Sequence, residues 1–170
     1  VAFWSDGAEK RRWLAIPNDG THDSRDEQVR FGDDGTFSFP IGSVLIKHVE
    51  YPVKTEAGPA MKKLETRFLI HSADSQYYFL TYHWLPDGSD AELVLSGKEE
   101  SIVLDSTKPD ETITWTYPSI ADCGSCHAPA NGMVLGATLA QLNSETFYPQ
   151  TGRTAHQLLT LQHLGILTVP

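Results

Sequence analysis

The chain has 170 residues with 13 basic and 22 acidic side chains, which gives a formal net charge of −9. This charge disfavours nucleic acid and anionic membranes as partners. The sequence contains no run of about 18 apolar residues, so no membrane span is predicted. The length suits one domain over 1–170, which we expect to be mostly β over 1–118 and helical over 119–170.

The first regular elements are expected near residues 9–14, which are compatible with a short helix or with the start of a strand. The pattern becomes clearly β at residues 43–49, where apolar and polar residues alternate. A period of two places Lys47 on one face of this strand together with Leu45 and Val49.

Short β-type segments separated by turns follow as far as residue 117. Residues 72–76 form a polar loop between two of them, which is typical of a hairpin. Consecutive short strands with tight turns predict an antiparallel sheet. The expected strands are 66–71, 77–84, 91–95, 101–104 and 112–117.

Helices are expected beyond Pro118. Ser119 and Asp122 have the spacing of a capping box, so a helix is predicted to begin there. Two further helices are predicted over 137–143 and 154–164, the latter from an apolar stripe. The predicted fold class is therefore α+β: an antiparallel sheet followed by short helices that carry and cover a c-type haem.

The haem prediction comes from the motif Cys123-Gly124-Ser125-Cys126-His127. Two thiols three residues apart can each bond one vinyl-derived carbon of a porphyrin, and the adjacent imidazole can ligate its iron as the proximal ligand. We predict one covalent haem c. A zinc site would need more ligands, since these are the only two cysteines, and a thioredoxin-like pair would follow an early strand.

The distal ligand stays open on sequence alone. His163, on the predicted 154–164 helix, is the leading candidate, with Met61 and Lys47 as alternatives. Met133 follows His127 by six residues, which span at most about 20 Å, too short a path around the porphyrin. A distal side without a protein ligand would leave iron able to bind small molecules.

Segments along nearly the whole chain resemble a family of bacterial secreted c-type haem domains. Such domains sit beside quinone-dependent sugar dehydrogenase-like or carbohydrate-binding modules, so the resemblance implies extracellular redox work linked to polysaccharide or sugar oxidation. The matching segments are 3–14, 39–47, Glu65-Thr66-Arg67, Tyr82-His83-Trp84, Asp90-Ala91, Gln141-Leu142-Asn143 and Gln157-Leu158.

Residues 40–47 are also similar to a strand of the β-sheet cytochromes c-prime and their hydroxylamine-oxidising relatives. In those relatives the lysine that matches Lys47 is cross-linked to the haem. The alternative is a strand lysine that extends its ammonium into water. The chain departs from that family by the 43 residues that follow His127.

Together these features predict a mono-haem cytochrome domain that transfers electrons in the periplasm or outside a bacterial cell. The segment is expected to be a mature or excised part of an exported protein, because c-type haem is attached outside the inner membrane. Its expected partners are a redox protein or domain and carbohydrate-active modules of the same polypeptide. The alternative function is a haem enzyme or gas-binding cytochrome, for which Glu65 and Arg67 would serve only if their face meets the haem.

Overall fold

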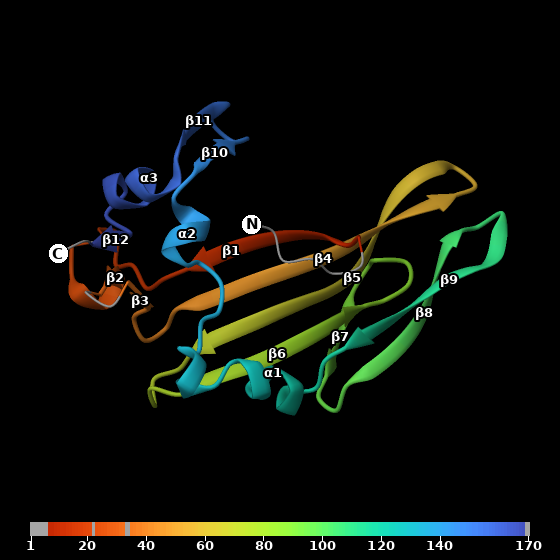
Figure 1. Cartoon of the computed structure of the whole chain (residues 1–170), viewed down its shortest axis with the longest axis horizontal. Helices are drawn as coiled ribbons and strands as arrows, with labels where there is room; N and C mark the ends of the chain where they lie inside the picture. Colours follow the sequence, from red (N-terminus) through yellow and green to blue (C-terminus); the bar gives the residue numbers. More distant parts are fainter. Residues whose placement is uncertain (1–6, 22, 33–34, 169–170) are drawn as a thin grey trace. The chain divides into compact units, whose positions relative to one another are not determined.

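A computed structural model describes residues 7–21, 23–32 and 35–168, and these are mostly β (Figure 1). The strands are β1 (Glu9–Ala15), β2 (Val29–Phe31), β3 (Phe37–Ser38), β4 (Val44–Thr55), β5 (Gly58–His71), β6 (Tyr77–Trp84), β7 (Ala91–Val94), β8 (Lys98–Asp105), β9 (Lys108–Tyr117), β10 (Glu145–Tyr148), β11 (Arg153–His156) and β12 (Leu167–Thr168). The helices are α1 (Ile120–Cys126), α2 (Leu139–Leu142) and α3 (Gln157–His163), with 3-10 turns η1 (Arg25–Glu27) and η2 (Pro129–Asn131).

The main sheet has seven strands in the order β7-β6-β5-β4-β8-β9, and β1 pairs with β4 outside this path. Strands β4 and β5 are neighbours joined by only two residues, so they form a hairpin. The β6–β7 and β8–β9 pairs are antiparallel, whereas β4 and β8 pair in parallel. Two smaller sheets pair β10 with β11 and β2 with both β3 and β12.

The contacts divide the chain into two compact units. The first holds described residues 7–14, Leu45–Leu69 and Tyr78–Cys126, and so contains most of the main sheet and α1. The second holds the described parts of 15–44, Ile70–Tyr77 and 127–168. In this second unit β12 lies parallel to β2, with Leu167 opposite Val29, and both side chains are 4% exposed.

One face of the main sheet, which we call the core face, carries the hydrophobic core of the first unit. Its fully packed cluster consists of Val49, Leu64, Ile102, Trp115 and Tyr117. The opposite, outer face carries polar and aromatic contacts. Because side chains alternate along a strand, each residue two positions from a cluster member is assigned to the core face.

The alternation of buried and exposed side chains breaks in the middle of β5. Leu64 and Glu65 are consecutive, yet both side chains are 0% exposed. On the outer face, Lys63 stacks its ammonium over Trp84, 4.3 Å from the ring centroid, and Thr66 accepts a 2.9 Å hydrogen bond from Trp84 Nε1. Lys63 and Thr66 therefore share a face although they are three apart, as an extra residue in a β-bulge requires. As a consequence, the Glu65 carboxylate is buried beside the core residue Leu64.

The strand predictions are confirmed in position. The 77–84 strand is found with the predicted bounds, and the 72–76 loop is closed by a hydrogen bond from Ser72 N to Gln76 O of 2.8 Å. Residues 9–14 take the strand alternative, as part of β1. Among the described pairings, the parallel β4–β8 pair is the departure from a purely antiparallel sheet.

The predicted α+β architecture, with helices that carry and cover a c-type haem, is wrong. The described helices are short, and none is long and apolar enough to cross a membrane. The predicted 154–164 helix is a strand as far as His156 and a helix only from Gln157, because residues 153–156 pair with 145–148 as a hairpin. Strand pairing thus overrides an apolar stripe that has helical spacing.

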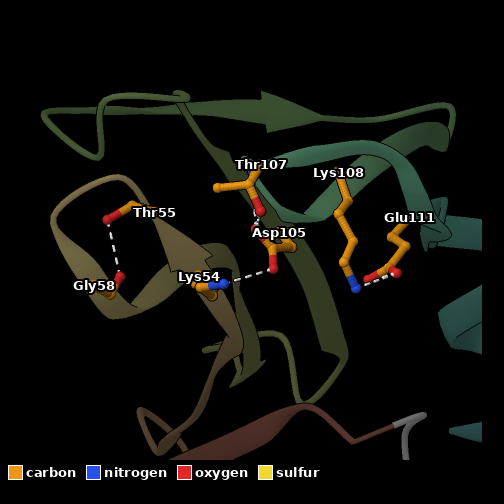
Figure 2. Close-up of polar contacts among 7 residues, drawn as sticks. All are labelled: Lys54, Thr55, Gly58, Asp105, Thr107, Lys108 and Glu111. Atoms are coloured by element: carbon orange, nitrogen blue, oxygen red, sulfur yellow. Dashed lines mark hydrogen bonds and ion pairs between the residues drawn. The ribbon is translucent and has the colours of Figure 1, made fainter.

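The β4–β8 junction is held by a polar turn, shown in Figure 2. Lys54 lies opposite Asp105, and their Nζ and Oδ2 atoms are 3.0 Å apart. The amide and hydroxyl of Thr107 donate to Asp105 Oδ1 at 2.9 and 2.7 Å. The Thr107 hydroxyl and amide, together with the Lys54 ammonium, lower the pKa of Asp105 to about 2.

Replacing Asp105 with asparagine should make stability less dependent on acidic pH. A lowered folded-state pKa means that ionised Asp105 stabilises the fold above about pH 4, and that this contribution is lost as the pH falls through about 2. The urea midpoint of the wild type should therefore exceed that of Asp105→Asn near neutral pH, and the two midpoints should become nearly equal near pH 2. Lys54→Met should keep most of the pH dependence, because Thr107 is the larger cause. A difference between the two urea midpoints that stays constant with pH would contradict the lowered pKa of Asp105.

Truncating the core leucine should strongly destabilise the first unit. We expect Leu64→Ala to lower the free energy of unfolding by about 2–5 kcal/mol, because the removed methyl groups leave a cavity in a packed cluster. Leu93→Ala, at a side chain that is 44% exposed in β7, should change it by no more than about 0.5 kcal/mol. Denaturant unfolding measures both, and equal losses would refute the assignment of the core face.

Candidate functional site

The cysteine motif begins in a well-capped first turn of helix. The Ser119 hydroxyl donates to Asp122 Oδ2 at 2.7 Å, and the amide of Asp122 donates back to Ser119 Oγ at 3.1 Å. These bonds confirm the capping spacing read from the sequence. The amide of Ile120 also donates to Leu95 O at 3.3 Å, which ties the start of α1 to the end of β7.

The two thiols have different surroundings. Cys123 is half-buried and hydrogen-bonded to the Thr81 side chain, whereas Cys126 is exposed. Burial raises the pKa of Cys123, and the nearby Arg67 guanidinium opposes that shift. His83 of β6 packs on core residue Tyr117, so His83 lies on the core face. Thr81 is two positions away on the same strand and therefore shares that face. Cys123, as the partner of Thr81, lies against the core face.

His127 follows directly after the end of α1 and begins the second unit. Its Nδ1 atom is 2.5 Å from the carbonyl oxygen of Met133, so Nδ1 carries the proton and donates. Met133 has a φ of 56°, in the left-handed region, and its amide donates to Ala128 O at 3.2 Å. The turn over 128–133 therefore fixes the imidazole tautomer in which Nε2 carries the lone pair.

A buried ion pair lies near Cys123. Two nitrogens of the Arg67 guanidinium donate to the Glu65 carboxylate: Nε to Oε2 at 2.9 Å and Nη2 to Oε1 at 2.5 Å. The Glu65 side chain is 0% exposed and that of Arg67 is 31% exposed. Lys47, on β4, is close enough to both for their charges to act on it. Burial, followed by the Arg67 charge, lowers the pKa of Lys47.

A second polar network occupies the core face around Glu100. Its Oε2 accepts hydrogen bonds from Tyr117 Oη at 2.7 Å and from His83 Nε2 at 2.9 Å. The Lys98 ammonium lies 3.2 Å from His83 Nδ1, on the other side of the ring from Glu100. Burial raises the pKa of Tyr117 far above its usual range, and its bond to the Glu100 carboxylate raises it further.

The three distal candidates lie in different places. Met61 is in β5 rather than in a loop; it is 38% exposed and lies two positions from outer-face Lys63. His163 ends α3 in the second unit with an exposed side chain. Lys47 shares the charged neighbours Arg67 and Glu65 with Cys123. Each stays a predicted ligand, and Lys47 is the one that the first unit places on the face of Cys123.

Within residues 7–21, 23–32 and 35–168, no three His, Cys, Asp or Glu side chains form a cluster that could hold a metal ion by itself. Comparisons with models of protein families, with curated proteins and with solved structures find no match to this chain.

Two features of the site escaped the sequence reading. The spacing of Glu65 and Arg67 places them on one face of a strand, which was visible, but the bulge that buries Glu65 has no sequence signal. The bond from His127 to the Met133 carbonyl was also missed, since it involves main chain and not the methionine sulfur.

Breaking the buried pair should cost more than removing it. We expect Arg67→Met to destabilise the first unit by about 3 kcal/mol, because it leaves the buried Glu65 carboxylate uncompensated. The double variant Glu65→Met with Arg67→Met should recover most of this loss, since an apolar pair needs no counter-charge.

Arg11→Met is the matched control, because Arg11 makes a 3.3 Å ion pair with Glu50 but its own side chain is 66% exposed. It should cost no more than about 1 kcal/mol. Urea unfolding of the wild type and these three variants measures the losses, and a double variant no more stable than Arg67→Met would contradict the uncompensated Glu65 charge as the cause.

Proposed function

We propose that this chain is a mono-haem c-type cytochrome domain that transfers electrons outside the cytoplasm of a bacterium. The observation that carries the proposal is the Cys123-Gly124-Ser125-Cys126-His127 motif together with the hydrogen bond from His127 Nδ1 to the Met133 carbonyl. Metal-ligating histidines usually donate their second ring nitrogen in this way, which orients the ring and raises its basicity.

The donor set of the chain fits a covalently held haem. Each cysteine thiol would add across one vinyl double bond, with sulfur on one carbon and hydrogen on the other, so attachment consumes no oxidant. Cys123 and Cys126 supply these thiols, and Nε2 of His127 would be the proximal ligand. The bound group supplies a one-electron iron couple, while this chain sets its burial, its hydrogen bonds and the charge around it.

Electron transfer is supported by the exposure of Cys126. A thioether at an exposed cysteine brings the adjacent porphyrin edge near the surface, where a redox partner can approach. The net charge of −9 suits a partner with a basic face. An extracytoplasmic location and carbohydrate-active modules in the same polypeptide belong to this proposal and rest on the resemblance to secreted haem domains.

A haem enzyme or gas-binding cytochrome is the second candidate function. The observation in its favour is the Glu65–Arg67 ion pair, because the charges of both residues act on Lys47 as well as on Cys123. A carboxylate and two cations on the face of Cys123 are groups that could bind and protonate a small ligand.

Covalent attachment is tested by intact mass. Protein exported from a host with a c-type maturation system should exceed its polypeptide mass by one haem and keep its porphyrin through acid-organic extraction. Cys123→Ala with Cys126→Ala should give the bare polypeptide, whereas Ser125→Ala should keep the haem. A wild type of bare polypeptide mass, or with extractable haem, overturns the proposal.

Spectra of the haem-loaded protein separate the two functions. Electron transfer predicts a low-spin iron whose reduced form ignores carbon monoxide, and the enzyme alternative predicts high-spin iron that binds it rapidly. Loss of the low-spin spectrum in one of His163→Ala, Lys47→Ala or Met61→Ala would identify the distal ligand. His127→Ala should impair attachment, and an unchanged low-spin spectrum in that variant would exclude His127 as a ligand.

A further inference from the structure

Strand β9 lies at one end of the main sheet. In the strand order it has β8 on one side, and no pairing within residues 7–21, 23–32 and 35–168 involves its other side. The strand is ten residues long. Backbone N–H and C=O groups along such an open side can pair with a further strand.

Sheets usually protect their edges with charged side chains, with proline or with short strands. Strand β7, at the other end of the sheet, has four residues, and four of the seven residues of β1 are charged. In β9 this protection covers only the first half, at residues 108–111. Figure 2 shows Lys108 and Glu111 of that half, which form a 2.7 Å ion pair. Residues 112–117 contain neither charge nor proline.

This unprotected half of β9 has a regular alternation. Trp115 and Tyr117 belong to the core cluster and are 8% and 0% exposed, whereas Thr112, Thr114 and Thr116 are exposed on the outer face. Threonine, isoleucine and the aromatic residues are the types that strands favour. The open edge is therefore built from strand-forming residues on both faces.

We propose that this edge pairs with β9 of a second copy of the chain, antiparallel about a two-fold axis at Thr114. The two Thr114 residues then lie opposite each other, Thr112 lies opposite Thr116 of the second copy, and Ile113 lies opposite Trp115 of the second copy. Thr–Thr pairs and pairs of an aromatic with a β-branched residue both stabilise antiparallel strands. The contact is the same patch on both copies, so it closes as a dimer. It does not depend on haem.

The sequence of β9 favours this register over its neighbours. An axis at Ile113 would set Glu111 opposite the buried Trp115. An axis at Trp115 would set Thr112 opposite Pro118, which has no N–H to donate. With the axis at Thr114, residues 112–116 form an uncharged ladder and no like charges face each other in it. Because this ladder is short, we expect a weak dimer with a Kd on the order of 10 µM or higher.

Sedimentation velocity over a concentration series that brackets this Kd tests the dimer on the chain as purified, with or without haem. The wild type should pass from monomer to dimer. Thr114→Lys sets two ammonium groups against each other at the axis and should raise the Kd by at least about tenfold. Thr114→Glu should do the same with two carboxylates. An equimolar mixture of these two variants should dimerise again, since opposite charges then meet.

Ser101→Lys is the matched control. Ser101 is exposed, and it lies directly opposite Thr114 on β8, so the substitution adds the same charge to the same face one strand further from the axis. Its Kd should stay close to that of the wild type. Exchange of the amide hydrogens of 112–116 should slow with rising concentration in the wild type and in Ser101→Lys, but not in Thr114→Lys.

Several results would overturn the inference. They are a wild type that is monomeric throughout the series, a dimer that Thr114→Lys leaves unchanged or that Ser101→Lys weakens equally, and a mixture of the two Thr114 variants that stays monomeric. Urea midpoints close to that of the wild type establish that the variants are folded. If a variant does not fold, the concentration dependence of amide exchange at 112–116 in the wild type decides.

Discussion

The burial of Glu65 is the constraint on which the electrostatics of the sheet depend. One extra residue in β5 turns this carboxylate into the core beside Leu64, where both side chains are 0% exposed. A carboxylate in such a place needs a fixed counter-charge and several hydrogen bonds. Arg67, two residues further along the same strand, supplies both through its fork. The bulge and the arginine are therefore one structural unit.

The neighbouring strands extend this pattern. The charges of Arg12 and Lys10 on β1 act on Lys47 together with that of Arg67. Helix α1 brings Cys123 to Thr81 on the core face. The more distant Glu100 is satisfied separately by Tyr117, His83 and Lys62, the last at 3.6 Å. The core face thus carries two separate groups of charged side chains, one around Glu100 and one around the Glu65–Arg67 pair.

The sequence predicted those elements of secondary structure that depend on short-range patterns of residues. Alternation placed the strands, and the Ser119–Asp122 spacing gave the start of α1. It failed in the C-terminal part, where the Leu158 and Leu161 stripe has helical spacing but residues 153–156 are held in a hairpin by 145–148. Pairing with a distant segment is not encoded in local periodicity. The same limit hides the β4–β8 pair, which joins Lys54 to Asp105 across 51 residues.

The candidate site divides in the same way. The cysteines and His127 are a contiguous motif, so their chemistry can be read directly from the sequence. The carbonyl partner of His127 depends on the backbone of Met133 at positive φ, which its side chain does not favour. The charges that act on Lys47 from β1 depend on the pairing of β1 with β4, and no feature of residues 9–14 predicts that neighbour.

The unequal surroundings of the two thiols bear on how such a protein is made. Cys126 is exposed, but Cys123 is half-buried against Thr81, and burial keeps its sulfur in the protonated, less reactive form. In the folded chain, any electrophile from solution can therefore approach the sulfur of Cys126 more easily than that of Cys123. Under the proposed function, bonding of both sulfurs would have to come before Cys123 packs against Thr81, which places the chemistry of assembly ahead of the completion of the fold.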